Sequence, residues 1–316
     1  MYTQAMDTMA KEVDGKAEGK PDRQLEDARL QERFDARIDG PRARMMLAIA
    51  ALAAASVLTV RGDRLFLPAR INGVAVEAAL DSGAEATIVD DDVARRAGMP
   101  DGRAVTARGS GGSADARLVP HGRVEALGLT LPDVTIAVID LDDVGDRLFG
   151  GRLEAIVGRD LFDAARIAID IDRATIATAS RAQSPHGVRL PLVARRGIET
   201  VPVSIEGRRR VRADFDLGNG SDVLIGRAYA DRIGLTKRVF ARESGGGIGG
   251  SVRRRIVMLR SLRIAGTTFR NVRAAIDDQP HAADANIGVR LLRRFRIVTD
   301  FPRRSVWLQP RRARTI

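Results

Sequence analysis

Two similar acidic segments, one in each half of this 316-residue chain, constrain its fold more than any other feature. Residues 78–92 read AALDSGAEATIVDDD, and residues 213–227 read ADFDLGNGSDVLIGR. In each segment an apolar run ends in an aspartate, Asp81 or Asp216, and a second apolar run follows a glycine-containing turn. A carboxylate between two strand-like apolar runs costs free energy unless something else holds it there. We therefore predict that the two aspartates face each other across a pseudo-twofold axis and share one proton.

Further segments recur in the same order in both halves of the chain. A short helix-like segment occurs at 93–99 and again at 229–235. A glycine-rich tip occurs at 109–113 and 245–250, and an apolar segment that contains a glycine occurs at 156–162 and 286–292. The spacing between the two copies is nearly constant for all of these segments, which indicates a duplicated domain. Within each copy, short apolar runs are broken by Gly, Pro and Asp, a pattern that predicts many short strands and an all-β fold.

Composition and pattern divide the chain into five regions. Residues 1–40 interleave acidic and basic side chains with few apolar ones, so they cannot bury enough surface to order themselves. The dipeptide Ser184-Pro185 marks a connection between the two copies. We expect a polar segment without fixed structure at residues 1–40 and an apolar leader or anchor at 41–60. A first lobe at 61–180, a linker at 181–187 and a second lobe at 188–316 follow.

The only long uncharged apolar run extends from Met45 to Val60. Arg42 and Arg44 precede it, and three alanines stand before Ser56, which is typical of a signal peptide. The run is slightly short for a membrane-spanning helix. We expect residues 45–60 to direct export or to associate with a membrane, which places the protein in the periplasm, outside the cell or on a membrane. A buried alanine-rich helix is the alternative.

The composition excludes several classes of chemistry. The sequence has no cysteine, which removes disulfides and cysteine-ligated metals, and its three histidines are too scattered for a zinc site. We therefore expect no metal and no cofactor. Residues 181–316 carry 29 basic and 11 acidic residues, but only 4% of the chain is aromatic, and no nucleic-acid-binding pattern is present. We interpret the basic half as a solvated arginine-rich surface and expect no nucleic-acid partner.

The sequence resembles retropepsin-type aspartic proteases, in the bacterial arrangement in which two copies are fused in one chain. Residues 81–84, Asp-Ser-Gly-Ala, match the family motif Asp-Thr/Ser-Gly-Ala/Ser. Residues 156–158, Ile-Val-Gly, match a later apolar-apolar-Gly segment that packs beneath the catalytic loop in the family. The resemblance covers roughly residues 64–310. It implies two tandem β-barrel lobes that form an intramolecular pseudo-dimer, and an aspartic endopeptidase that hydrolyses peptide or protein substrates as a monomer.

The resemblance also assigns roles to individual residues. Catalysis falls to Asp81 and Asp216, which activate a water held between them. Support of the two catalytic loops falls to Ser82, Gly83, Gly158, Leu217, Gly218 and Gly288. The glycine-rich tips are our candidates for substrate-covering flaps, with plain hairpin turns as the alternative, at Gly111, Gly112, Gly246 and Gly247.

The second copy departs from the family motif. Leu217 stands where the family has Ser or Thr, and Asn219-Gly220 follows in place of Ala or Ser. In the family the two hydroxyls cross-link the catalytic loops, and Leu217 has no hydroxyl to supply. A catalytically impaired peptide-binding protein with a vestigial Asp216 is therefore the alternative. A homodimer that pairs two copies of Asp81 is a third hypothesis.

Overall fold

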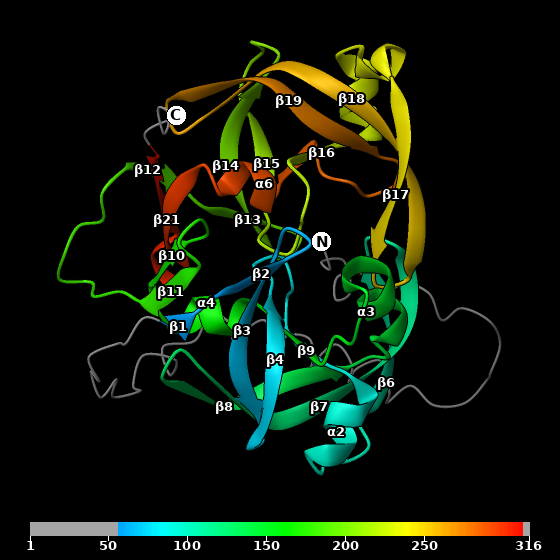
Figure 1. Cartoon of the computed structure of the whole chain (residues 1–316), viewed down its shortest axis with the longest axis vertical. Coiled ribbons are helices and arrows are strands. Elements are labelled where there is room, and N and C mark those ends of the chain that lie inside the picture. Colours follow the sequence, from blue (N-terminus) through cyan, green and yellow to red (C-terminus); the bar gives the residue numbers. More distant parts are fainter. Residues whose placement is uncertain (1–55, 312–316) are drawn as a thin grey trace, which may run out of the picture. The chain divides into compact units, whose positions relative to one another are not determined.

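The structure is a computed structural model that describes residues 56–311 (Figure 1). The polar segment 1–40 and most of the apolar segment 41–60 lie outside the described residues. In chain order the strands are β1 (Ser56–Val57), β2 (Thr59–Arg61), β3 (Arg64–Ile71), β4 (Val74–Leu80), β5 (Thr87–Val89), β6 (Arg103–Gly109), β7 (Gly112–Ala126), β8 (Leu129–Val138), β9 (Ala155–Val157), β10 (Ile167–Asp170), β11 (Thr175–Thr178), β12 (Val188–Pro191), β13 (Val193–Arg195), β14 (Ile198–Ile205), β15 (Val211–Phe215), β16 (Val223–Gly226), β17 (Ala241–Gly247), β18 (Gly250–Ile264), β19 (Thr267–Asp277), β20 (Ala285–Ile287), β21 (Phe295–Asp300) and β22 (Ser305–Pro310). The helices are α2 (Asp91–Arg96), α3 (Asp142–Phe149), α4 (Arg159–Ala164), α5 (Arg227–Arg232) and α6 (Val289–Leu292), with the 3-10 turns η2 (Leu235–Arg238) and η3 (Phe301–Arg303).

Most strands belong to two eight-stranded sheets of the same topology, one in each half of the chain. The strand order is β2-β3-β4-β9-β5-β8-β7-β6 in the first sheet and β13-β14-β15-β20-β16-β19-β18-β17 in the second. Each sheet has one additional pairing, β3 with β7 and β14 with β18, so it closes back on itself as a barrel. The predictions of an all-β fold and of two similar barrel lobes are therefore confirmed.

Local turn chemistry sets the first hairpin of each lobe. Asn72-Gly73 joins β3 to β4, and the connection between β14 and β15 contains Glu206-Gly207. All four residues have positive φ (46°, 86°, 55° and 70°), which type I′ hairpin turns require. Asn72 also accepts a hydrogen bond through Oδ1 from the N–H of Arg123 in β7 (2.8 Å). The turn therefore fixes the hairpin and ties it to the strand that closes the barrel.

A third sheet, of six strands, joins the two lobes in the order β1-β11-β10-β21-β22-β12. At its centre β10 of the first half pairs antiparallel with β21 of the second half, with Ala168 opposite Val298. The neighbouring pairs are symmetric about this one, Ile167 with Thr299 and Ile169 with Ile297. Ala168 and Val298 are equivalent positions of the duplication, because each follows the glycine of its own apolar segment at the same spacing. The predicted pseudo-twofold relation between the lobes is therefore confirmed.

Reciprocal ion pairs flank this central ladder. Arg166 Nε lies 3.1 Å from Asp300 Oδ2, and Arg296 Nε lies 3.4 Å from Asp170 Oδ2. Each pair joins an arginine of one half to an aspartate of the other half, and the two pairs occupy equivalent positions of the repeat. The Arg166–Asp300 pair is buried, and Asp300 also pairs with Arg181 (3.2 Å), so removing Asp300 leaves the buried Arg166 charge without its carboxylate, at a cost of about 3–5 kcal/mol. These pairs fix how the two halves join.

The last residues of the predicted leader belong to the folded domain. Ser56 and Val57 pair with β11, the Leu58 side chain is 1% exposed, and β2 begins at Thr59. The predicted boundary at residue 60 is therefore wrong, because an uncharged apolar run has the same composition in a leader and in buried strands. Export or membrane association stays a prediction for residues 41–55, which lie outside the described part. Within residues 56–311, no helix is long and apolar enough to cross a membrane.

Candidate active site

The two predicted catalytic loops occupy equivalent positions at the ends of β4 and β15. Asp81 follows β4, and its N–H donates to Val157 O in β9 (3.0 Å). Asp216 follows β15, and its N–H donates to Ile287 O in β20 (3.1 Å). Each aspartate is thus anchored to the apolar strand of its own lobe that lies beneath the loop. The backbone of the two loops is held in the same way in both halves.

Glycine is required directly after each of these apolar strands. A Cβ atom at Gly158 would lie 2.6 Å from Ala86 O, and one at Gly288 would lie 2.3 Å from Ser221 O. Both distances are far below a normal van der Waals contact. Any larger residue would therefore push the supporting strand away from the catalytic loop.

The carboxyl groups of Asp81 and Asp216 meet between the two loops. Both residues are only 1% exposed, and they lie close enough for the charge of Asp216 to raise the pKa of Asp81. Gly83 N–H donates to Asp81 Oδ1 (2.7 Å) and orients that carboxyl group. Gly218 allows the close approach, because a Cβ atom there would lie 2.2 Å from Asp81 Oδ2. The structure therefore brings the two predicted acids together in a buried site.

A single serine bridges the two loops. Ser82 Oγ donates to Phe215 O (2.9 Å) and accepts from Leu217 N–H (3.0 Å), so it holds both sides of Asp216. The apolar side chain of Leu217 forms no matching bridge to the first loop and is fully buried in the main apolar core instead. Ser82 of the first loop therefore holds the second loop by hydrogen bonds, whereas Leu217 of the second loop contributes by packing in the apolar core.

A polar network that the sequence analysis missed holds Asp216. Its Oδ1 accepts from the N–H groups of Gly218 (2.9 Å) and Asn219 (3.0 Å), and its Oδ2 accepts from Asn286 Nδ2 (2.7 Å). Asn219 Nδ2 in turn donates to Asn286 Oδ1 (2.7 Å), and Ser221 N–H donates to Asn219 Oδ1 (2.9 Å). The amide of Asn286 is therefore fixed in the orientation that stabilises a carboxylate.

A comparison of the two copies in the sequence would have indicated this network. Asn219 follows Asp216 at the spacing at which Ala84 follows Asp81. Asn286 begins the second apolar segment where Ile156 begins the first, so both amides replace apolar residues of the first copy. Two polar replacements at equivalent positions, each beside a predicted catalytic loop, indicate a shared role.

The surroundings of the two acids shift their pKa values in opposite directions. Burial raises the pKa of Asp81 to about 6, and the negative charge of Asp216 acts in the same direction. Burial also opposes ionisation of Asp216, whereas the hydrogen bonds from the Asn286 amide and the Gly218 N–H favour its charged form and lower its pKa. The geometry therefore favours a proton on Asp81 and a charge on Asp216.

The two glycine-rich tips are hairpin ends that contact each other. The β6–β7 hairpin turns at Gly109–Gly112, and the β17–β18 hairpin turns at Gly247–Gly250 (Figure 1). Gly111 N–H donates to Ile248 O across the contact (2.9 Å). A Cβ atom at Gly112 would lie 2.9 Å from Gly249 O, so side chains there would separate the tips. The flap candidates Gly111 and Gly112 lie at this contact.

The second tip is also held by the first lobe. Arg147 of α3 donates through Nη2 to Gly247 O (2.9 Å), and Ile248 is 2% exposed in an apolar cluster formed by first-lobe residues. The flap candidates Gly246 and Gly247 directly precede this buried isoleucine. The two hairpins therefore meet in a closed arrangement in which each tip reaches the opposite lobe.

A comparison with known protein families finds a match in both halves of the chain. The family model described as Aspartyl protease matches residues 67–161 and 201–291, which together make up more than half of the chain. The chain belongs to the aspartyl protease family. Each matched region covers one barrel lobe, which confirms the resemblance to the retropepsin-like group and the tandem duplication. No curated protein matches the chain.

A pocket lies beside Asp216, on the side of the second lobe. Asp214, Asp277 and Asn286 line it from the second lobe, and Ser110 lines it from the tip of the first hairpin. Asn286 therefore contacts the pocket and also donates to Asp216. The pocket adjoins the pair of acids.

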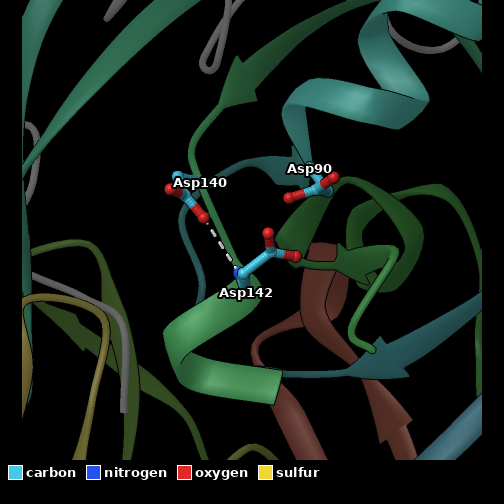
Figure 2. A group of neighbouring side chains, drawn as sticks. All are labelled: Asp90, Asp140 and Asp142. Atoms are coloured by element: carbon cyan, nitrogen blue, oxygen red, sulfur yellow. Dashed lines mark hydrogen bonds between the residues drawn. The ribbon is translucent and has the colours of Figure 1, made fainter. Parts of the chain in front are cut away.

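A second group of acids, in the first lobe, has a structural explanation. Asp90, Asp140 and Asp142 lie together in the first lobe, with the carboxyl groups of Asp90 and Asp142 facing each other (Figure 2). Asp90 caps α2 by accepting from Asp92 N–H (2.9 Å) and also accepts from Leu141 N–H (3.1 Å). The charge of Asp90 raises the pKa of Asp142. These acids join the starts of α2 and α3, and we assign them no catalytic role.

Proposed function

We propose that this protein is an aspartic-type endopeptidase that hydrolyses peptide bonds with a water held between Asp81 and Asp216. The observation that carries the proposal is the buried, interacting pair of carboxyl groups at the meeting point of two equivalent loops. Two unit charges about 3 Å apart repel by roughly 5 kcal/mol at an effective dielectric constant of about 20. The pair therefore carries one proton and one negative charge over the working pH range, as in aspartic proteases generally.

The surroundings of the two acids support different roles for them. Ionised Asp216 removes a proton from the water, and the water oxygen attacks the scissile carbonyl carbon. Protonated Asp81 donates its proton to the carbonyl oxygen, which gives a neutral tetrahedral intermediate. The proton on Asp216 then passes to the leaving nitrogen as the C–N bond breaks. Asp81 regains its proton as the new carboxyl group forms, so both acids return to their starting states.

Asn286 is a positioning residue in this scheme. It does not touch the reacting atoms, but its amide donates to Asp216 Oδ2 and stabilises the charged form of that acid. Asn219 holds the Asn286 amide in the required orientation. The network favours the protonation state in which Asp216 acts as the base.

The two hairpin tips act as flaps in the proposed cycle. Their contact through Gly111 and Ile248 covers the site, so the tips separate to admit a peptide and close again to exclude water. Both acids come from one chain, which supports a monomer as the active form. Sizing chromatography of the active protein measures this directly.

The proposal is tested by incubating the full chain with casein and with a random peptide library from acidic to neutral pH. We expect internal peptide-bond cleavage that a pepstatin-like transition-state analogue inhibits. Folded protein that cleaves no peptide at any pH would refute the proposal. Peptide binding without turnover would instead support the catalytically impaired alternative.

A further inference from the structure

We propose that the pocket beside Asp216 binds a positively charged side chain, lysine or arginine, of the substrate residue next to the scissile bond. This inference rests on the proposed peptidase function and deepens it by naming a class of substrate. The pocket is continuous with the site, because Asn286 both lines it and donates to Asp216. Asp214 lies in β15 two residues before Asp216, and its pKa is raised by the charge of Asp216, so the two acids are close neighbours.

Two buried polar side chains in this pocket have no partner among the described residues. Asp214 is 7% exposed, and within residues 56–311 no hydrogen bond or ion pair reaches its carboxylate. Ser110 is 8% exposed, and its Oγ makes no hydrogen bond to any described residue. Leaving a buried donor or acceptor unsatisfied costs about 1–3 kcal/mol, and more for a charged group. A ligand that supplies hydrogen-bond donors to both atoms removes this cost.

The charge of the pocket favours a cation. Burial and the charge of Asp216 raise the pKa of Asp214 to about 7, against the opposing charges of Arg196 and Arg195, because no cation of the described chain contacts its carboxylate directly. Arg196 also lines the pocket, but it is exposed to solvent and donates to His281 O instead of to Asp214. An ammonium or guanidinium group in the pocket supplies both the positive charge and the N–H donors.

The second acid of the pocket, Asp277, is better compensated than Asp214. Burial raises the pKa of Asp277, but the charge of Arg254 and a hydrogen bond from Gln279 N–H (3.2 Å) act against this rise. Asp277 therefore adds negative potential to the pocket, and Asp214 provides the carboxylate that needs a partner.

The equivalent half-site of the first lobe has the opposite character. Strand registers identify the matching positions: Ala79 pairs with Ile156 as Asp214 pairs with Asn286, and Ile88 pairs with Ile156 as Leu224 pairs with Asn286. At the hairpin tips Ile248 matches Ser110, since each is the first residue of its turn. The first-lobe half-site is therefore apolar where the second is acidic. We infer a substrate with an apolar side chain on one side of the scissile bond and a basic one on the other.

The experiment uses fluorescent peptides whose scissile bond is replaced by a hydroxyethylene group, so binding is measured without turnover. One flanking residue is leucine, and the other is lysine, its neutral isostere norleucine, or glutamate, in both orientations. In one orientation we expect the lysine peptide to bind the full-length protein about tenfold or more tightly than the norleucine peptide. The glutamate peptide should bind most weakly.

Asp214→Asn keeps the shape of the side chain and removes its charge, so the lysine preference should fall to about twofold or less. Ser110→Ala, at a hairpin tip, should reduce the preference by a smaller factor. Asp115→Asn is the matched control, because it removes one exposed carboxylate of β7 in the first lobe and should leave the preference intact. Circular dichroism and thermal melting verify that each variant is folded.

Equal affinity for lysine and norleucine in both orientations would overturn the inference, and so would a lysine preference that survives in folded Asp214→Asn. Failure of every peptide to bind at millimolar concentration would overturn it too. The outcome is separable from the peptidase proposal. A lysine preference that depends on Asp214, in a protein that cleaves nothing, would support the cationic pocket and refute the peptidase activity.

Discussion

The two lobes hold their aspartates with the same backbone contacts but surround them with different side chains. In both, the acid follows the third strand of its sheet order and is anchored to the neighbouring apolar strand. Around Asp81 the neighbouring positions are the apolar Ala84 and Ile156, whereas around Asp216 they are Asn219 and Asn286. The fold brings the two acids together, and the amide of Asn286 favours the charged form of Asp216.

The residues that follow the two aspartates show a similar division. Ser82 contributes two hydrogen bonds across the lobe boundary, and a typical net value is about 1 kcal/mol for each. Leu217 contributes full burial of an apolar side chain, which stabilises by about 1.5–3 kcal/mol. Burial of Leu217 therefore compensates for the missing hydroxyl in the free energy of folding. It does not replace the hydrogen bonds that such a hydroxyl would make to orient the first loop.

The largest loss of activity is expected when either catalytic acid is made neutral. We expect Asp81→Asn and Asp216→Asn each to lower kcat/KM by about 10³-fold or more, because each acid has its own step in proton transfer. The measurement is cleavage of one peptide by the two variants side by side. Activity that survives Asp216→Asn would identify that acid as vestigial, and a dimer on sizing chromatography would then indicate pairing of two copies of Asp81.

Making the second lobe resemble the first at Asn286 should remove the difference between the acids. Asn286→Leu takes away the donor to Asp216 Oδ2, so the pKa of Asp216 should rise. Since Asp216 must be ionised to act, the acidic limb of the pH–rate profile should move to higher pH, and kcat should fall by about 10- to 100-fold with KM nearly unchanged.

The counterpart change at Ile156, to valine, is the matched control and should leave the acidic limb in place. An Asn286→Leu profile that overlays the wild-type profile would exclude a positioning role for this amide.

The wild-type pH profile tests the same asymmetry without mutation. Activity needs a proton on Asp81, whose pKa is raised by burial to about 6. The rate should therefore fall as the pH rises through about 6, by about tenfold for each further pH unit. On the acidic side it should fall only below the ordinary aspartate range, because the pKa of Asp216 is lowered. A plateau that extends unchanged to pH 8 would contradict this assignment.

The smallest effects are expected from the residues that follow the aspartates. Leu217→Ala should lower the free energy of unfolding by about 2–5 kcal/mol, because it empties a fully buried site. Ser82→Ala should lower it by about 1–3 kcal/mol, because it leaves Phe215 O and Leu217 N–H without their partner. Urea titration gives the stabilities, and kcat should respond more to Ser82→Ala. The reverse order in stability would contradict the assigned division.

Local patterns allowed much of the fold to be predicted from the sequence. The Asp81 turn, the Asn72-Gly73 hairpin and the glycines after the supporting strands each follow from the conformation of a few adjacent residues. The order of repeated segments then indicated the duplication and the pairing of the two acids.

Contacts between distant side chains were not predictable in the same way. The Asn219–Asn286 hydrogen bond joins residues far apart in the chain, and the burial of Ile248 depends on how the second hairpin meets the first lobe. Helix α3 has no helical counterpart between β19 and β20, a stretch that the structure describes in full. The start of the folded domain was placed too late because Leu58 packs in the core and yet belongs to an uncharged apolar run.

The ladder between β10 and β21, with its reciprocal arginine–aspartate pairs, has a further consequence. Because the ladder is self-complementary, the same contacts would join either half to a copy of itself. An assembly of two identical halves has no means of telling its acids apart, so its proton spends equal time on each. Covalent linkage lets mutations accumulate in one half alone, and a fixed direction of proton flow becomes possible.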